Sequence, residues 1–253
     1  MNNALSAEWI KFSSLRGSWV RVGLVSVVYV LATLMALSLF NSDFGTASES
    51  TAGPDRVRVL TSGNILTSLV MVVLGVKVFT DEIKTRSIIN SVAAIPDRAD
   101  LLAAKALLVG VAGVVAALVA NLISVTVAVI GLDQKGFSVG LQDDDLVRAV
   151  VGGICHLTIA ALFGLGIGII MNSPTSAVAV GITWPLAGEV MVGSMLPDRL
   201  AEILPFEAGR ALFEAPARDD LPPWEGGAIF LAWTAVLLLV GWQVFERRDL
   251  GSS

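Results

Sequence analysis

The sequence is poor in the residues on which metal centres and disulfides depend. It contains one cysteine and one histidine among 253 residues, and only 15% of its residues are charged. The single cysteine, Cys155, excludes an internal disulfide and any cysteine-rich metal site. His156 follows it directly, and adjacent residues of a helix point about 100° apart, which favours a buried histidine over a metal ligand. We therefore predict no metal site.

The sequence indicates neither an ATPase nor an intramembrane protease. The chain has no G-x-x-x-x-G-K-[ST] phosphate-binding loop and no soluble segment large enough for an ATPase fold. Its match to G-x-S-x-G, GFSVG at residues 136–140, lies between two apolar runs and not within one, and no pair of aspartates lies in the middle of an apolar run, so the sequence indicates neither a serine nor an aspartyl intramembrane protease. We therefore expect no catalytic residue and no cofactor in this chain.

Apolar residues are abundant instead. They make up 55% of the sequence, and the mean hydropathy is +0.77, which is more apolar surface than one soluble core can hide. Because about 20 helical residues cross the hydrocarbon of a bilayer, the sequence predicts an all-α membrane protein with six transmembrane helices. We expect one transmembrane domain over residues 1–253, with spans at about 19–40, 60–80, 101–132, 146–171, 175–196 and 227–245.

Lysine and arginine indicate the orientation of the spans. With the N-terminus inside, ten of these residues fall on the cytoplasmic side and seven outside, which favours that orientation. We predict a multi-pass protein of the cell membrane with both termini in the cytoplasm.

A charged segment, residues 81–105, interrupts the apolar runs between the second and third spans. Ile88, Val92 and Ile95 recur at spacings of four and three, and Pro96 follows them, so a short amphipathic helix is predicted. Such a helix can lie on the lipid headgroups or bind a partner protein. The residues alone leave both alternatives open.

The loop between the fifth and sixth spans is long, and Pro205 divides it into two short amphipathic stretches. These stretches can lie as short helices over the outer face or dip into it. Within the spans, Asn121, Ser124, Thr126 and Thr158 predict hydrogen bonds between helices. Glycines of the fourth span predict close packing against a neighbour: Gly152, Gly153, Gly164, Gly166 and Gly168.

Three features occur together along the chain. They are the N-terminal segment SAEWIKFSSLRGSW, the long loop before the sixth span, and the charged segment with Glu82, Thr85, Pro96, Arg98 and Lys105. Together they resemble the permease subunits of ATP-binding-cassette transporters of the second type, which are six-helix exporter permeases. The resemblance covers essentially the whole chain.

The resemblance implies an N-terminal interfacial helix and a cytoplasmic coupling helix that is bound by an ATPase. The apolar face of the interfacial helix would carry Leu5, Trp9, Phe12 and Leu15. Coupling needs an apolar ridge, for which Ile88, Val92 and Ile95 are suited, and a polar rim that fixes orientation. The rim residues are Asp81, Glu82, Lys84, Thr85 and Arg86.

A polar residue inside a span is a functional candidate, and Glu189 follows Trp184 and Pro185 by about one turn. In a paired permease these three residues would line the pathway or meet the partner copy. Alternatively, the Glu189 carboxyl is protonated, or is bonded to a neighbouring serine or threonine.

The implied partners are two ABC ATPase subunits that carry ATP and Mg, a second copy of this permease or a related one, and the lipid bilayer, with no nucleic acid. Mostly apolar and small residues in the spans favour an amphipathic cargo, such as a lipid, a drug or an antimicrobial peptide. The alternatives are a membrane sensor or assembly factor that transports nothing, and an intramembrane enzyme.

Overall fold

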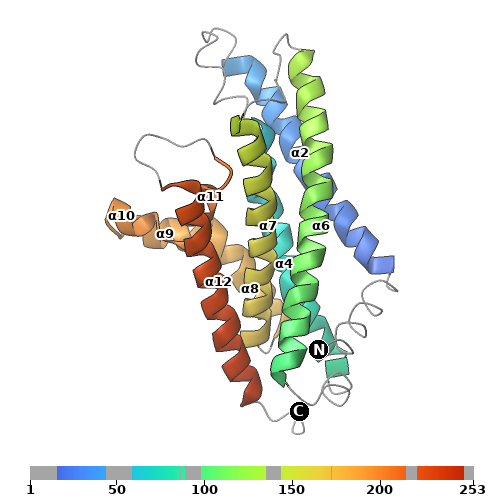
Figure 1. Cartoon of the computed structure of the whole chain (residues 1–253), viewed down its shortest axis with the longest axis vertical. Coiled ribbons are helices and arrows are strands. Elements are labelled where there is room, and N and C mark those ends of the chain that lie inside the picture. Colours follow the sequence, from blue (N-terminus) through green and yellow to red (C-terminus); the bar gives the residue numbers. More distant parts are fainter. Residues whose placement is uncertain are drawn as a thin grey trace.

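The computed structural model describes residues 16–43, 59–85, 87–88, 98–134, 144–171, 173–214 and 221–247. Every regular element in these ranges is a helix, and none of the residues within them forms a strand. In chain order (Figure 1), the helices are α2 (Arg16–Asp43), α4 (Gly63–Lys84), α6 (Arg98–Asp133), α7 (Asp144–Ile170), α8 (Pro174–Thr183), the π-helical turn η1 (Trp184–Gly188), α9 (Glu189–Gly193), α10 (Asp198–Ala201), α11 (Pro205–Arg210) and α12 (Pro223–Glu246).

Within the described residues, six helical stretches are long and apolar enough to cross a membrane. They are Val22–Leu39, Val59–Lys84, Arg98–Asp133, Leu146–Ile170, Pro174–Gly193 and Pro223–Glu246. The prediction of an all-α protein with six membrane-spanning helices is therefore confirmed for the described part of the chain, and the molecule is a multi-pass membrane protein by helix length and hydropathy.

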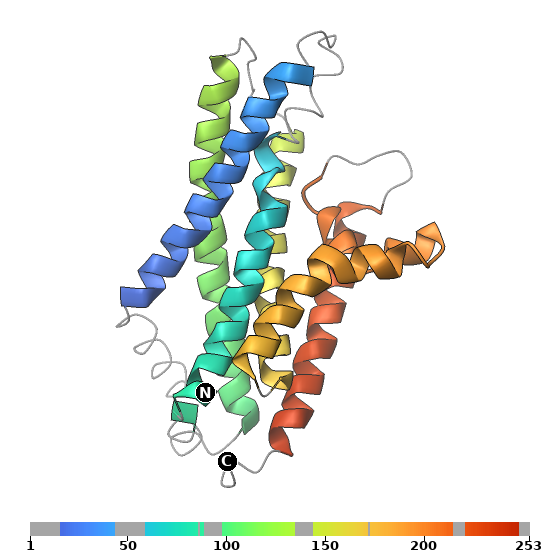
Figure 2. The same cartoon turned by 180° about the vertical axis from the view of Figure 1, so that it is seen from behind.

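Helices α4 and α7 form the centre of the bundle. In the most apolar part of these two helices, 61% and 67% of the residues are buried, more than in any other span. Helices α2 and α6 pack on one side of this pair, and α8 and α12 on the other (Figures 1 and 2). We call the end of the bundle at which α4 ends and α6 begins the lower end, as drawn in Figure 1, and the opposite end the upper end.

Glycines allow α4 and α7 to approach closely. A Cβ atom added at Gly164 of α7 would overlap the carbonyl oxygen of Val72, and one at Gly75 of α4 would overlap that of Ala161. At Gly168 an added Cβ would lie 2.8 Å from the carbonyl oxygen of Val76. The close packing predicted for the fourth span is thus present, and at Gly164 and Gly168 its partner is the second span.

Hydrogen bonds between buried polar side chains join α2 to α6. The hydroxyl of Tyr29 donates to Oδ1 of Asn121 at 3.0 Å, and the hydroxyls of Thr33 and Ser124 share a hydrogen bond. The prediction of interhelical bonds is wrong for Thr126 and Thr158, because their hydroxyls donate to carbonyl oxygens one turn earlier in their own helices. A threonine in a helix can satisfy its hydroxyl locally, without any partner helix.

The fifth span changes direction at Pro185. Proline has no backbone N–H to donate, and the chain passes through the π-helical turn η1, in which the N–H of Glu189 bonds to the carbonyl of Trp184. Beyond η1, α9 and α10 run sideways from the bundle, and α11 returns towards α12 (Figures 1 and 2). The two stretches around Pro205 are therefore short helices, and the second packs against the bundle.

Candidate functional site

The polar rim predicted for the coupling helix begins in the last turn of α4, at the lower end. Lys84 and Thr85 are exposed, and the Thr85 hydroxyl donates to the carbonyl of Asp81 at 2.9 Å, which closes the end of the helix. Asp81 pairs with Lys77 at 3.5 Å across a partly exposed surface. These side chains are accessible to water or to a partner at this end.

Glu82 lies inside the bundle instead. Its carboxylate accepts a hydrogen bond from Nζ of Lys105 at 2.7 Å, and the Lys105 side chain has no exposed surface. The rim predicted for partner contact therefore loses one member, because Glu82 bridges α4 to α6. A periodicity in the sequence indicates this position, since Glu82 follows the buried residues Gly75 and Phe79 at helical spacing.

Replacing Lys105 with methionine is expected to reduce the free energy of unfolding by about 3–5 kcal/mol, because the buried Glu82 carboxylate loses the Lys105 ammonium. The double variant with Glu82→Gln should recover most of this loss. Thermal unfolding in detergent measures the stability of the single and the double variant, which belong to one double-mutant cycle. The control is Lys77→Met, whose exposed pair should contribute less than about 1 kcal/mol. Equal losses of stability in Lys77→Met and Lys105→Met would show that Glu82 and Lys105 do not form a buried ion pair.

The predicted apolar ridge is described only at Ile88. This side chain is 5% exposed and belongs to the main apolar core, so it is packed against the bundle. Val92, Ile95 and Arg86 lie outside the described residues, as do the interfacial residues Leu5, Trp9, Phe12 and Leu15. Ile88 is therefore an anchor of the connection between α4 and α6.

Glu189 joins the bent fifth span to the N-terminus of α11. Its carboxylate accepts hydrogen bonds from the backbone N–H groups of Phe206 and Glu207, at 2.8 Å and 2.9 Å, and from the Trp184 indole at 3.1 Å. These N–H groups belong to the first turn of α11, where a helix lacks internal acceptors and favours negative charge. Among the described residues the partners of this carboxylate are an indole and a helix end, not a serine or a threonine.

Sequence reasoning did not find the aromatic cluster that holds α11 against α7 and α12. His156 of α7 is buried, with 1% of its surface exposed, and its ring lies 4.9 Å from that of Phe213 and 5.3 Å from that of Phe230. The ring of Phe206 of α11 lies against that of Phe230, tilted by 54°, with 5.0 Å between the ring centres. These residues are far apart in the sequence, so no local pattern predicts their contact.

Close backbone approach strengthens the same junction. A Cβ at Gly152 of α7 would overlap the carbonyl oxygen of Leu212, and one at Gly226 of α12 would overlap that of Ala208. On the outer side of α11, Arg210 pairs with Glu214 at 2.9 Å and with Glu207 at 3.1 Å. Partial burial lowers the pKa of the Arg210 guanidinium, but the two carboxylates outweigh burial and the pKa is raised.

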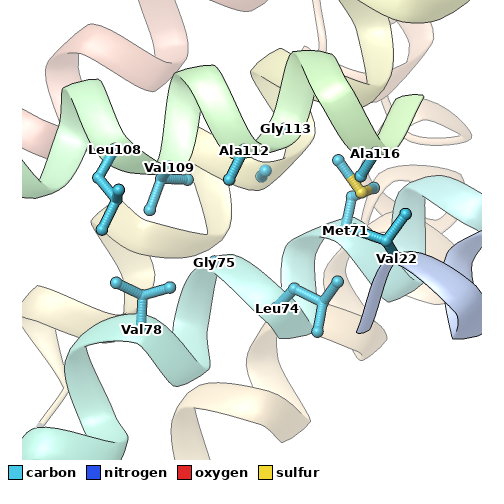
Figure 3. Close-up of a pocket in the computed structure, with 11 residues that line it drawn as sticks. Val22, Met71, Leu74, Gly75, Val78, Leu108, Val109, Ala112, Gly113 and Ala116 are labelled. Atoms are coloured by element: carbon cyan, nitrogen blue, oxygen red, sulfur yellow. The ribbon is translucent and has the colours of Figure 1, made fainter. Parts of the chain in front are cut away.

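An apolar cavity of about 50 Å³ lies between α4 and α6. Met71, Leu74 and Val78 line it from α4, with Leu108 and Ala112 facing them from α6 (Figure 3). For comparison, an engineered apolar cavity that binds a molecule as small as benzene has a volume of about 150 Å³. This cavity is therefore too small for a lipid, drug or peptide.

No group of three or more histidine, cysteine, aspartate or glutamate side chains that could hold a metal ion occurs within the described ranges. His156 in particular is surrounded by phenylalanine rings.

Comparison with known proteins finds no family model and no curated protein that the sequence matches. The chemistry of the chain is therefore inferred from its residues and geometry.

Proposed function

We propose that the chain is the transmembrane permease subunit of an ATP-driven exporter, coupled to separate ATPase subunits as in ABC transporters of the second type. The observation that carries the proposal is the arrangement at the lower end. Glu82 and Lys105 join the end of α4 to α6, so the connection 86–97 starts and ends at a fixed part of the bundle. A connection held at both ends can deliver force from a partner to the spans.

In this proposal the lower end faces the cytoplasm of the cell, and both termini lie there. The segment before α2 is the interfacial helix, and the connection 86–97 contains the coupling helix. Val92 and Ile95 contact the ATPase, with Asp81, Lys84 and Arg86 at the rim. Two ATPase subunits bind ATP and Mg and perform all the covalent chemistry.

The pathway requires a second permease, either another copy of this chain or a related one. The cavity of about 50 Å³ between α4 and α6 cannot hold a cargo molecule. By contrast, α9 and the turn before it present Leu186, Val190 and Met191 with more than half of each side chain exposed. This apolar face suits lipid, a facing permease, or an amphipathic cargo such as a lipid, a drug or an antimicrobial peptide.

The proposal is tested by coexpressing the chain with the ATPase encoded by a neighbouring reading frame. The purified complex is placed in liposomes that contain a fluorescent phospholipid, and we expect lipid movement that requires ATP and Mg. The control is an ATPase whose phosphate-binding lysine is replaced. Failure of the chain to form a complex with the ATPase contradicts the proposal. A complex that hydrolyses ATP but moves no lipid, drug or peptide probe supports the sensor or assembly factor.

Val92→Asp is expected to reduce ATPase association at least about tenfold, because one buried charge costs more than 1.4 kcal/mol in an apolar interface. The matched control is Asn90→Asp, which adds the same charge about 160° away around the predicted helix. Pull-down of the coexpressed ATPase with the inserted permease measures ATPase association for each of the two variants. Equal association of the two variants would show that the ridge does not bind the ATPase.

A further inference from the structure

Arg98, the first residue of α6, binds the end of the last membrane span. Its Nη1 atom donates hydrogen bonds to the backbone carbonyls of Phe245 and Glu246, at 2.7 Å and 2.9 Å. These carbonyls lie in the last turn of α12, where a helix has no internal donors left and favours a cation. One charged side chain thus joins the beginning of α6 to the end of α12.

The Phe245 ring brings a third helix to the same point. It is buried, with 1% of its surface exposed, and stacks edge-on against Phe79 of α4 at 5.5 Å. The Arg98 guanidinium lies 5.4 Å from the centre of the Phe245 ring. Helices α4, α6 and α12 therefore meet around one aromatic ring.

The buried pair of Glu82 and Lys105 adds a second connection between α4 and α6. Arg98 and Lys105 are seven residues apart, which places them on the same face of α6, about 10 Å from each other along its axis. We call these residues, Phe79, Glu82, Arg98, Lys105 and Phe245, the lower clamp. The clamp fixes both ends of the connection 86–97 to each other and to α12.

Helix α2 is arranged differently at this end. In two opposite views α2 runs obliquely and begins away from the lower end, although Val22 and Val25 still pack on the bundle, whereas α12 ends close to the start of α6 (Figures 1 and 2). At the lower end a displacement of the connection 86–97 would therefore reach α12 directly, through Arg98.

We propose that Arg98 is a positioning residue that transmits movement of the connection 86–97 to α12, so that the lower parts of α4, α6 and α12 move as one body. The inference rests on the proposed function, because the movement is supplied by the partner ATPase. Arg98 itself contacts no cargo. Its role is to link the connection 86–97, which the ATPase moves, to α12, the span that packs against α7 and α11.

The test compares Arg98→Ala with Arg98→Lys in the complex with the coexpressed ATPase, reconstituted in liposomes with the fluorescent phospholipid. Lysine keeps the charge and a donor, so it should retain most transport. Alanine should lower the number of lipids moved per ATP hydrolysed by at least about tenfold, which is the effect of one charge-assisted hydrogen bond on an equilibrium. ATPase association and the rate of ATP hydrolysis should stay within about twofold of wild type.

Arg247→Ala is the matched control, because Arg247 is exposed and lies next to Glu246 at the end of α12. It should transport like the wild type. Hydrogen exchange of the chain alone in lipid nanodiscs gives a readout that needs no ATPase, and Arg98→Ala should exchange faster in the last turn of α12. If Arg98→Ala does not insert, Arg98→Gln, which has no charge, replaces it in both assays.

The outcomes separate the two proposals. If the wild-type chain binds no ATPase, the proposed function is contradicted, and the transmission role is contradicted with it. Hydrogen exchange of the chain alone still reports whether the lower clamp exists. If the wild-type complex transports lipid and the Arg98→Ala complex moves as many lipids per ATP hydrolysed, the transmission role of Arg98 is overturned while the proposed function stands. Equal loss of transport and ATP hydrolysis shows a structural role and also overturns it.

Discussion

Replacing Gly164 with alanine is expected to reduce the free energy of unfolding by about 3 kcal/mol, the upper part of the range for overpacking a core. An added Cβ would overlap the carbonyl oxygen of Val72 in the facing helix α4. Backbone atoms cannot rotate away as a flexible side chain can, so α4 and α7 would have to separate. Because these are the two most buried spans, their separation would disturb every neighbouring contact.

Thermal unfolding in detergent measures this effect, with an expected decrease in Tm of roughly 6–12 °C for a chain of this size. The control is Gly110→Ala in α6, which adds the same methyl group where no atom lies within 4 Å. Alanine favours a helix over glycine by about 1 kcal/mol, so this control should keep or raise the Tm. A Tm of Gly164→Ala equal to that of Gly110→Ala would show that α4 and α7 are not in close backbone contact.

This contrast between two glycines also shows what a sequence can predict about the bundle. The long apolar runs define the six spans because a helix needs about 20 apolar residues to cross a bilayer. Repeated glycines in the fourth span indicate close packing, but they do not identify its partner, since helical periodicity describes one helix at a time. The contact of Gly164 with Val72 depends on tertiary structure.

The candidate site shows a similar limit. Glu82 belongs to the charged run DEIK, and composition alone places it on the surface with Asp81 and Lys84. Its helical spacing from Gly75 and Phe79 predicts the buried face, which is where the structure has it. The partner, Lys105, lies 23 residues further along the chain, beyond the reach of any local pattern. Burial could thus be read from the sequence, whereas the ion pair could not.

Replacing Glu189 with alanine is expected to destabilise the junction between the bent fifth span and α11 by about 3–5 kcal/mol, because three N–H donors lose a charged acceptor. Two of these donors are the backbone N–H groups of Phe206 and Glu207, and the third is the Trp184 indole. In a bilayer, water is scarce as a replacement acceptor. Helix α11 should therefore detach locally while the six spans remain folded.

Hydrogen exchange over residues 204–214 measures this detachment, and exchange in α4 and α7 reports whether the spans stay intact. Glu189→Gln keeps one carbonyl oxygen as acceptor, so its exchange should be intermediate. The matched control is Glu202→Gln in the segment just before α11, which should leave exchange unchanged.

The same variants separate the two roles that Glu189 can have. If the carboxylate only holds α11, transport should fall in proportion to the exchange of residues 204–214 across Glu189→Gln and Glu189→Ala. If it also lines the pathway, Glu189→Gln should lose transport while α11 remains protected. Wild-type exchange of α11 in Glu189→Ala would contradict the anchoring role, because a buried carboxylate that accepts three hydrogen bonds cannot be removed from a helix end without consequence.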